Sequence, residues 1–222
     1  MIKGAIFDVD GTLLDSMEIW EDAGIRYLRR IGVMPEEGLS GVLYSMTMSE
    51  GAEYVKEHYH LPFSIDEIIQ GVLDTVRDFY FYEVLPKSGA KELLSWIKDK
   101  NITIAAATAS DREHVEAAFE RLGIAGYFGQ IFTCREVGSG KRHPLIYEKA
   151  AAYLGWKPEE ILVFEDAFYA LMTAKKAGFR TVGIYDRFSE GEQEEIKKQA
   201  DVYLADLIKG PEILAEKEEI RL

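Results

Sequence analysis

Residues 2–12 read IKGAIFDVDGT, and this stretch decides the fold. The run Ile2–Phe7 is short and mostly apolar, which is typical of a strand buried on both faces of a parallel sheet. Asp8 and Asp10 follow it at once, and Gly11 permits a sharp turn after them. Because ligands bind beyond the carboxyl ends of the strands in open α/β sheets, we expect both aspartates at a functional edge.

Five more short apolar runs recur later in the chain, and segments of helical spacing and length separate them. These runs are Ile102–Ala107, Ile131–Thr133, Ile161–Phe164, Thr181–Tyr185 and Val202–Leu204. Such alternation of strands and helices predicts an α/β fold in which helices cover a parallel sheet. We therefore expect a Rossmann-like, three-layer α/β/α core.

A long interval after the first run breaks this alternation, because residues 16–83 contain no convincing strand. Met17–Ile31 and Asp66–Tyr82 instead repeat apolar residues at helical spacing. One helical face of the first segment is expected to carry Trp20, Ala23, Tyr27, Leu28 and Ile31. Ser64 and Glu67 fit a capping box at the start of the second segment.

The pattern divides the chain into a core of residues 1–15 and 84–222 and an inserted, all-helical cap of residues 16–83. The hinges would lie at Leu13–Ser16 and Glu83–Ser88. Inserts of this kind often act as lids over an active site, and a rigid extra layer is the alternative.

The composition limits the classes of partner. Lys and Arg number 26 and Asp and Glu number 39, so the net charge is −13, which argues against nucleic acid or an anionic membrane. We expect a small-molecule substrate, no nucleic acid, no membrane, and a monomer or a weak dimer. Cys134 is the only cysteine, which excludes an internal disulfide and a cysteine-based zinc site. Because neither a signal peptide nor a membrane-spanning run is evident, we expect a cytoplasmic protein.

The pair Asp8 and Asp10 suits two kinds of chemistry. Two carboxylates at this spacing can bind a divalent metal, or one can act as a nucleophile while the other carries a proton as general acid. A plain turn is the alternative without function. An EF-hand calcium loop is excluded, because Leu13 and Leu14 lie where oxygen ligands are needed.

Two further candidate segments follow apolar runs. A hydroxyl such as that of Thr108, in Thr108-Ala109-Ser110, can donate to a phosphate oxygen at a strand end. Ser110 and Glu113 also fit a capping box, so we expect Ser110 to be a helix cap first and a ligand contact second. Glu165 and Asp166 are adjacent carboxylates suited to a hard cation, although an isolated pair of this kind could equally cap the next helix.

The remaining candidate, third of the four in chain order, is Lys141, in the stretch GSGKRHP of residues 138–144. A fixed ammonium can hold both a nucleophile and developing phosphoryl charge. The stretch is no P-loop, because Arg135 replaces the first glycine and Arg142 follows the lysine. We interpret Arg142 and His143 as a solvated basic turn, and Arg112 could add positive charge at the same edge.

Taken in chain order, the four segments resemble the haloacid dehalogenase superfamily of phosphotransferases, and within it the β-phosphoglucomutase-like phosphatases with a helical cap. The match covers essentially the whole chain, with departures from the usual lysine motif at Arg142 and Leu145. The resemblance implies that Asp8 attacks phosphorus to form an aspartyl-phosphate. It also implies that Asp10 protonates the leaving group and then activates water.

The resemblance also implies Mg²⁺ as the cofactor. Its ligands would be the Asp8 and Asp166 carboxylates and the Asp10 main-chain carbonyl, with Glu165 in the inner or second shell. The expected substrate contacts are Thr108, Ala109, Ser110, Lys141 and, in the cap, Trp20.

A magnesium-dependent phosphatase of a small phosphorylated metabolite is the function that this pattern favours. A β-phosphoglucomutase-like mutase is the alternative. Mutases that resemble this chain carry a His near Trp20 and cationic residues in the stretch that here reads YSMTMS at 44–49, which is uncharged. A non-catalytic binding protein is disfavoured because Asp8 and Asp10 are both present. Sugar phosphates, phosphoglycolate-like acids and nucleotides all remain candidate substrates.

Overall fold

The structure, a computed structural model, describes residues 1–217. Its internal contacts divide the chain into two compact units, one made of Met1–Asp15 and the chain from Leu85 onward, the other of Ser16–Val84. In the described part of the chain, every helix is too short or too polar to cross a lipid bilayer.

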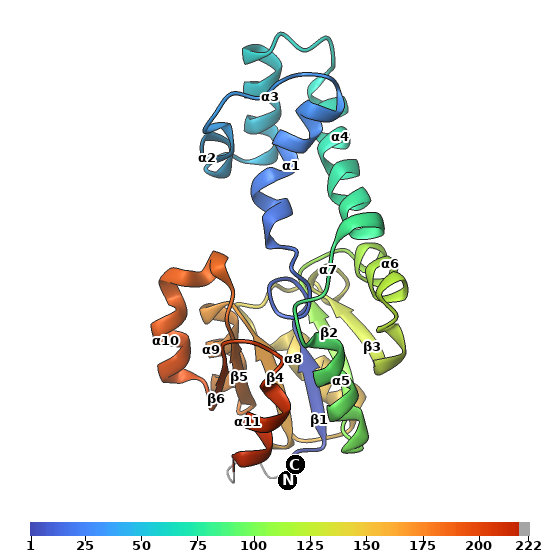
Figure 1. Ribbon diagram of the computed structural model, residues 1–222, viewed down its shortest axis with the longest axis vertical. Coiled ribbons are helices and arrows are strands. Elements are labelled where there is room, and N and C mark those ends of the chain that lie inside the picture. Colours follow the sequence, from blue (N-terminus) through green and yellow to red (C-terminus); the bar gives the residue numbers. More distant parts are fainter. Residues whose placement is uncertain (218–222) are drawn as a thin grey trace. The chain divides into compact units, whose positions relative to one another are not determined.

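The first unit is built on a six-stranded, entirely parallel sheet in the order β3-β2-β1-β4-β5-β6 (Figure 1). The strands are β1 (Gly4–Phe7), β2 (Thr103–Thr108), β3 (Phe128–Thr133), β4 (Ile161–Glu165), β5 (Arg180–Ile184) and β6 (Val202–Leu204). All six predicted strands are present, and the predicted α/β fold is confirmed. All four residues of β1 are buried because β1 lies between β2 and β4, which is why its sequence is mostly apolar.

The predicted bounds are least accurate at the sheet edge. β3 begins at Phe128, three residues before the predicted start at Ile131, because Gly129 and Gln130 are exposed and carry no apolar signal. An edge strand faces water along part of its length, so a search for apolar runs finds only its buried end.

Helices cover both faces of the sheet, with α5 and α11 in front of it and α8 behind it in Figure 1. They are α5 (Ala90–Asp99), α6 (Arg112–Leu122), α7 (Cys134–Val137), α8 (Leu145–Leu154), α9 (Phe168–Lys176), α10 (Gln193–Gln199) and α11 (Gly210–Glu216). Three 3₁₀ turns, η2 (Ala125–Tyr127), η3 (Pro158–Glu160) and η4 (Arg187–Glu192), complete the unit. Ile146 and Ala150 of α8 and Ala174 of α9 pack in one buried core with Ile6 and Val163 of the sheet.

The second unit consists of helices. They are α1 (Met17–Arg30), α2 (Leu39–Tyr44), α3 (Met48–His58), α4 (Ile65–Asp78) and a π-helical turn, η1 (Phe79–Glu83). The predicted capping box is confirmed, because the Ser64 N–H donates to the Glu67 carboxylate at 2.7 Å and the Glu67 N–H donates to the Ser64 hydroxyl at 3.2 Å.

The helical face expected for α1 is buried at Ala23, Tyr27 and Leu28 but not at Trp20. Trp20 is 48% exposed, whereas its neighbour Ile19 is fully buried. The buried stripe therefore begins at Ile19 and not at Trp20, because Ile19, Ala23 and Tyr27 share a face at spacings of four residues.

Asp201 holds the edge strand β6 to β5. Its carboxylate accepts hydrogen bonds from the Thr181 main-chain N–H at 2.7 Å and from the Thr181 hydroxyl at 2.9 Å, and Lys175 Nζ lies 3.3 Å away. Partial burial alone would raise the pKa of Asp201, but the hydrogen bonds from Thr181 and the charge of Lys175 outweigh it. The pKa of Asp201 therefore lies below its ordinary value of 3.8.

We expect Asp201→Ala to lower the free energy of unfolding at neutral pH by about 2 kcal/mol, because it leaves the buried Thr181 N–H without its acceptor. Since folding lowers the pKa of Asp201, its charge stabilises the fold above pH 3.8, and this stabilisation disappears as the pH falls through the lower folded value. Urea unfolding at neutral pH and at about pH 3 measures how the free energy of unfolding depends on pH. The difference in free energy of unfolding between wild type and Asp201→Asn should be smaller in acid than at neutral pH. An equal difference at both pH values would contradict the stabilising role of the Asp201 charge. Exposed Asp99→Asn is the control.

Candidate active site

The turn after β1 presents Asp8 and Asp10. The Asp8 N–H donates to the Phe164 carbonyl at 3.0 Å, which extends the pairing of β1 with β4 by one residue. Gly11 then takes a φ of +80°, and its N–H donates to the Leu14 carbonyl at 3.0 Å. The predicted sharp turn at Gly11 is confirmed, and a residue with a Cβ would be strained there.

Three buried carboxylates, those of Asp8, Glu165 and Asp166, form a carboxylate cluster at the carboxyl ends of β1 and β4. One oxygen atom from each lies within 4.8 Å of an oxygen of the other two. Sheet pairing brings them together, because β1 and β4 run in parallel with Phe7 opposite Phe164. The structure thus places the first and fourth predicted segments side by side, as their positions at strand ends require.

The ammonium of Lys141 lies inside this carboxylate cluster, although the residue is only 5% exposed. Its Nζ donates to Asp8 Oδ1 and, at 2.5 Å, to Glu165 Oε1. Burial alone would lower the pKa of Lys141, but the charges of Asp8 and Glu165 outweigh burial and raise the pKa above its ordinary value. Lys141 is therefore a permanent cation beside the first aspartate.

The carboxylate cluster has the chemistry of a divalent-metal site. Burial raises the pKa of Asp8, raises that of Glu165 to about 7 and raises that of Asp166 well above its ordinary value. The charge of Asp8 further raises the pKa of Glu165 and of Asp166. Because three carboxylates face one ammonium, a divalent cation would supply the missing positive charge, and carboxylate oxygens are ligands that Mg²⁺ prefers.

The side chain of Asp10 is held at the end of β2. Asp10 Oδ2 accepts hydrogen bonds from the Ser110 hydroxyl at 2.7 Å and from the Thr108 hydroxyl at 3.3 Å. The Thr108 hydroxyl in turn accepts the Ser110 N–H at 2.9 Å. The second predicted segment therefore meets the first through Asp10, while the exposed Ala109 lies between the two hydroxyl residues.

The expected helix cap at Ser110 is wrong. α6 begins at Arg112, and Asp111 occupies its cap position. The Ser110 hydroxyl donates to Asp10 Oδ2 instead, because the parallel pairing of β1 and β2 brings the segments that follow the two strands together. The contact joins residues that follow different strands, which a local cap pattern cannot reveal.

Sequence reasoning missed two polar partners of the carboxylate cluster, Tyr147 and Thr12. The Tyr147 hydroxyl donates to Glu165 Oε1 at 2.7 Å, and the Thr12 hydroxyl donates to Asp166 Oδ1 at 3.0 Å. Burial and the charge of Glu165 raise the pKa of Tyr147 well above its ordinary value, so it remains a hydrogen-bond donor. Tyr147 lies in an apolar helical pattern that indicates only core packing. Thr12, by contrast, follows Asp10 by two residues, and a polar residue at this position could have been predicted to contact the site.

The three other predicted cations differ from Lys141 in their burial and in their partners. Arg112 does not add free charge to the edge, because its guanidinium pairs with Glu136 at 2.6 Å and with Glu116 at 3.0 Å. Arg142 and His143 are exposed, as expected for a solvated basic turn, and the Arg142 guanidinium lies 4.7 Å from the centre of the Tyr169 ring.

Trp20 belongs to the helical unit, so its part in substrate binding stays a prediction. Together with Tyr44, Met46 and Met48 it lines a cavity of about 240 Å³ within that unit. The lining is mainly apolar, and Glu21 is the one charged residue in it among the described residues.

Comparison with known proteins identifies the family of the chain. Residues 2–178 match the family model of the haloacid dehalogenase-like hydrolases. Validoxylamine A 7'-phosphate phosphatase of Streptomyces hygroscopicus subsp. limoneus is 31% identical over 209 residues, 93% of this chain and 95% of the relative. A phosphorylated carbohydrates phosphatase of Thermotoga maritima is 26% identical over 96% of this chain and 97% of its own length.

A similar fold occurs in a solved structure. The β-phosphoglucomutase of Clostridium difficile superposes with a TM-score of 0.65 and 21% identity, over 94% of this chain and 93% of the mutase. At this identity the comparison shows the fold alone.

Proposed function

The chain belongs to the haloacid dehalogenase-like hydrolase family and is a phosphatase of phosphorylated sugars or other small metabolites, and we propose that it works through an aspartyl-phosphate on Asp8. The observation that carries the proposal is the contact between the buried Lys141 ammonium and Asp8, next to Glu165 and Asp166. The charge of Lys141 favours the ionised form of Asp8 against the effect of burial, and the contact fixes the carboxylate in direction for attack on phosphorus.

In the first step, a carboxylate oxygen of Asp8 attacks phosphorus, and the bond from phosphorus to the leaving-group oxygen breaks. Asp10 donates its proton to that oxygen, so the substrate leaves as an alcohol. In the second step, Asp10 takes a proton from water, the water oxygen attacks phosphorus, and the bond to Asp8 breaks. The hydroxyls of Thr108 and Ser110 hold the Asp10 carboxylate in place for both proton transfers.

Positive charge is needed at the phosphoryl oxygens during both steps. Lys141 supplies a fixed ammonium at Asp8, and Thr108 places a hydroxyl at the same strand edge. We propose that Asp8, Glu165, Asp166 and the Asp10 main-chain carbonyl hold Mg²⁺. When bound, the metal would neutralise charge on the phosphate oxygens.

We propose that the helical residues 16–83 act as a cap that excludes bulk water and selects the leaving group. Trp20 is the proposed cap contact, because its exposed indole adjoins a largely apolar cavity. An aromatic surface of this kind suits the apolar face of a sugar or polyol, and both named relatives act on phosphorylated compounds.

The test is hydrolysis by the purified protein of p-nitrophenyl phosphate and of a panel of phosphorylated sugars, acids and nucleotides. We expect activity in Mg²⁺ to fall by about 100-fold or more after EDTA treatment, because one lysine cannot neutralise both the carboxylate cluster and the phosphate. Added Mg²⁺ should restore the activity. Unchanged hydrolysis in EDTA would contradict the metal site, and inactivity toward the whole panel would contradict the phosphatase.

The mutase is a second candidate because of the fold shared with a β-phosphoglucomutase. A mutase must hold two phosphates, yet residues 44–49 carry no cation. Formation of glucose 6-phosphate from β-glucose 1-phosphate in the presence of a bisphosphate would favour the mutase, whereas release of inorganic phosphate alone favours the phosphatase.

A further inference from the structure

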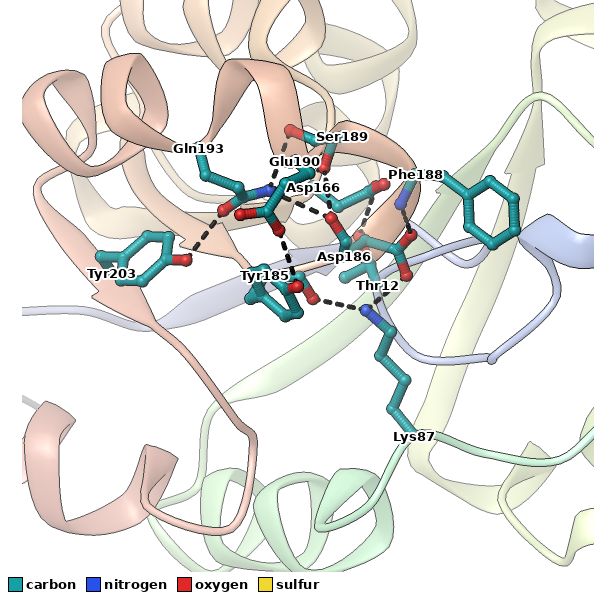
Figure 2. Close-up of polar contacts among 10 residues, drawn as sticks. All are labelled: Thr12, Lys87, Asp166, Tyr185, Asp186, Phe188, Ser189, Glu190, Gln193 and Tyr203. Atoms are coloured by element: carbon teal, nitrogen blue, oxygen red, sulfur yellow. Dashed lines mark hydrogen bonds and ion pairs between the residues drawn. The ribbon is translucent and has the colours of Figure 1, made fainter.

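A second ion pair, between the partly buried Lys87 and the buried Asp186, lies at the same sheet edge as the carboxylate cluster, and the proposed mechanism does not use it. Lys87 Nζ is 2.7 Å from Asp186 Oδ2, and the Asp186 side chain is only 3% exposed. Figure 2 shows the pair in one view with Thr12 and Asp166.

The sheet brings Asp186 to the same edge as Asp166. β4 and β5 pair in parallel with Glu165 opposite Gly183, so Asp166 and Asp186 both leave the sheet at its carboxyl end. Asp186 therefore follows the strand next to the one that Asp166, a proposed metal ligand, follows.

The carboxylate of Asp186 is fixed in place by its own partners. Asp186 Oδ1 accepts the Phe188 N–H at 2.9 Å, while Oδ2 faces Lys87. Lys87 Nζ also donates to the Tyr185 carbonyl at 2.6 Å. These contacts direct Asp186 toward Lys87 and make it a source of charge near the metal site.

Lys87 also has a main-chain connection to the site. Its N–H donates to the Leu13 carbonyl at 2.8 Å, and Leu13 follows Thr12, whose hydroxyl donates to Asp166. Lys87 can therefore act through its main-chain hydrogen bond or through its charge. The two roles predict different effects of substitution on the metal affinity.

We propose that Lys87 and Asp186 are positioning residues that set the electrostatic potential at the divalent-metal site of this phosphatase. The Lys87 ammonium neutralises Asp186, so the metal experiences chiefly the charges of the carboxylate cluster and Lys141. The inference rests on the proposed function, because it concerns the affinity of the site for a divalent ion. One uncompensated charge at the end of the strand next to a metal ligand changes that affinity by about tenfold or more.

The test measures Mn²⁺ binding to the metal-free, full-length protein by electron paramagnetic resonance of free Mn²⁺, and Mg²⁺ binding by competition. The titrations of all variants are done at the same pH and ionic strength. We expect Lys87→Met to bind Mn²⁺ about tenfold more tightly and Asp186→Asn about tenfold more weakly. The double variant should return to within about twofold of wild type, and Lys87→Arg, which keeps the charge, should match wild type.

Weaker binding in both single variants, with no recovery in the double variant, would show a structural role and overturn the proposal. Unchanged affinity in all variants would also overturn it. If Lys87→Met does not fold, the comparison of Asp186→Asn with the double variant decides, because only an electrostatic role predicts recovery on removal of the lysine. A wild-type protein that binds no Mn²⁺ would instead contradict the proposed function, so the two failures are distinguishable.

Discussion

Asp8→Asn is expected to lower turnover by about 10⁴-fold or more, the scale seen when the nucleophile of an enzyme is removed. The amide has nearly the same shape as the carboxylate but cannot attack phosphorus. Lys141 keeps its 2.5 Å contact with Glu165, so the variant should remain folded. Steady-state hydrolysis of p-nitrophenyl phosphate in Mg²⁺ measures the loss, and thermal unfolding checks the fold.

A direct readout accompanies this prediction. Acid-quenched wild-type protein should yield a phosphorylated peptide that contains Asp8, and Asp8→Asn should not yield it. Asp99→Asn, an exposed change of the same chemistry, should behave as wild type. Near-wild-type turnover in Asp8→Asn, or phosphate on another residue, would contradict the role of Asp8 as nucleophile.

Lys141→Met is expected to reduce both activity and stability. It leaves the buried carboxylates of Asp8 and Glu165 without their cation, and removing one partner of such a pair costs about 3–5 kcal/mol of the free energy of unfolding. Turnover should fall by about 10²- to 10³-fold, because a fixed charge at the phosphoryl group is lost. Urea unfolding without metal and hydrolysis with Mg²⁺ measure the two effects.

Added Mg²⁺ should recover part of the lost stability of Lys141→Met, because the metal replaces positive charge within the carboxylate cluster. Lys149→Met, at an exposed position of α8, is the matched control and should leave both quantities unchanged. Wild-type stability of Lys141→Met without metal would contradict the ion pairs described for Lys141.

Most of the sheet and part of the site could be predicted from short stretches of the sequence. A strand buried on both faces must be apolar along its whole length, so runs such as Ile161–Phe164 indicate strands directly, and the edge strand β3 shows why partly exposed strands are harder. A polar residue directly after such a run must lie at the carboxyl edge. Asp8, Thr108 and Glu165 are of this kind.

Other contacts could not be predicted, because they depend on side chains that meet from distant parts of the chain. Ser110 looked like a helix cap until the fold brought Asp10, which is 100 residues away in sequence, to its hydroxyl. Arg112 looked like a free cation until its guanidinium met Glu136. In both cases the partner comes from another element of the fold, so no local pattern could predict it.

The amino-acid sequence by itself determined the parallel sheet, the helical insert and the edge at which Asp8, Asp10, Glu165 and Asp166 gather. The reason is that apolar runs, and the polar residues that directly follow them, are properties of the chain. Only the tertiary structure decided which side chains are paired there: Tyr147 with Glu165, Ser110 with Asp10 and Lys87 with Asp186. The physical reason is that a hydrogen bond or ion pair requires contact within a few ångströms, and packing between elements sets that distance.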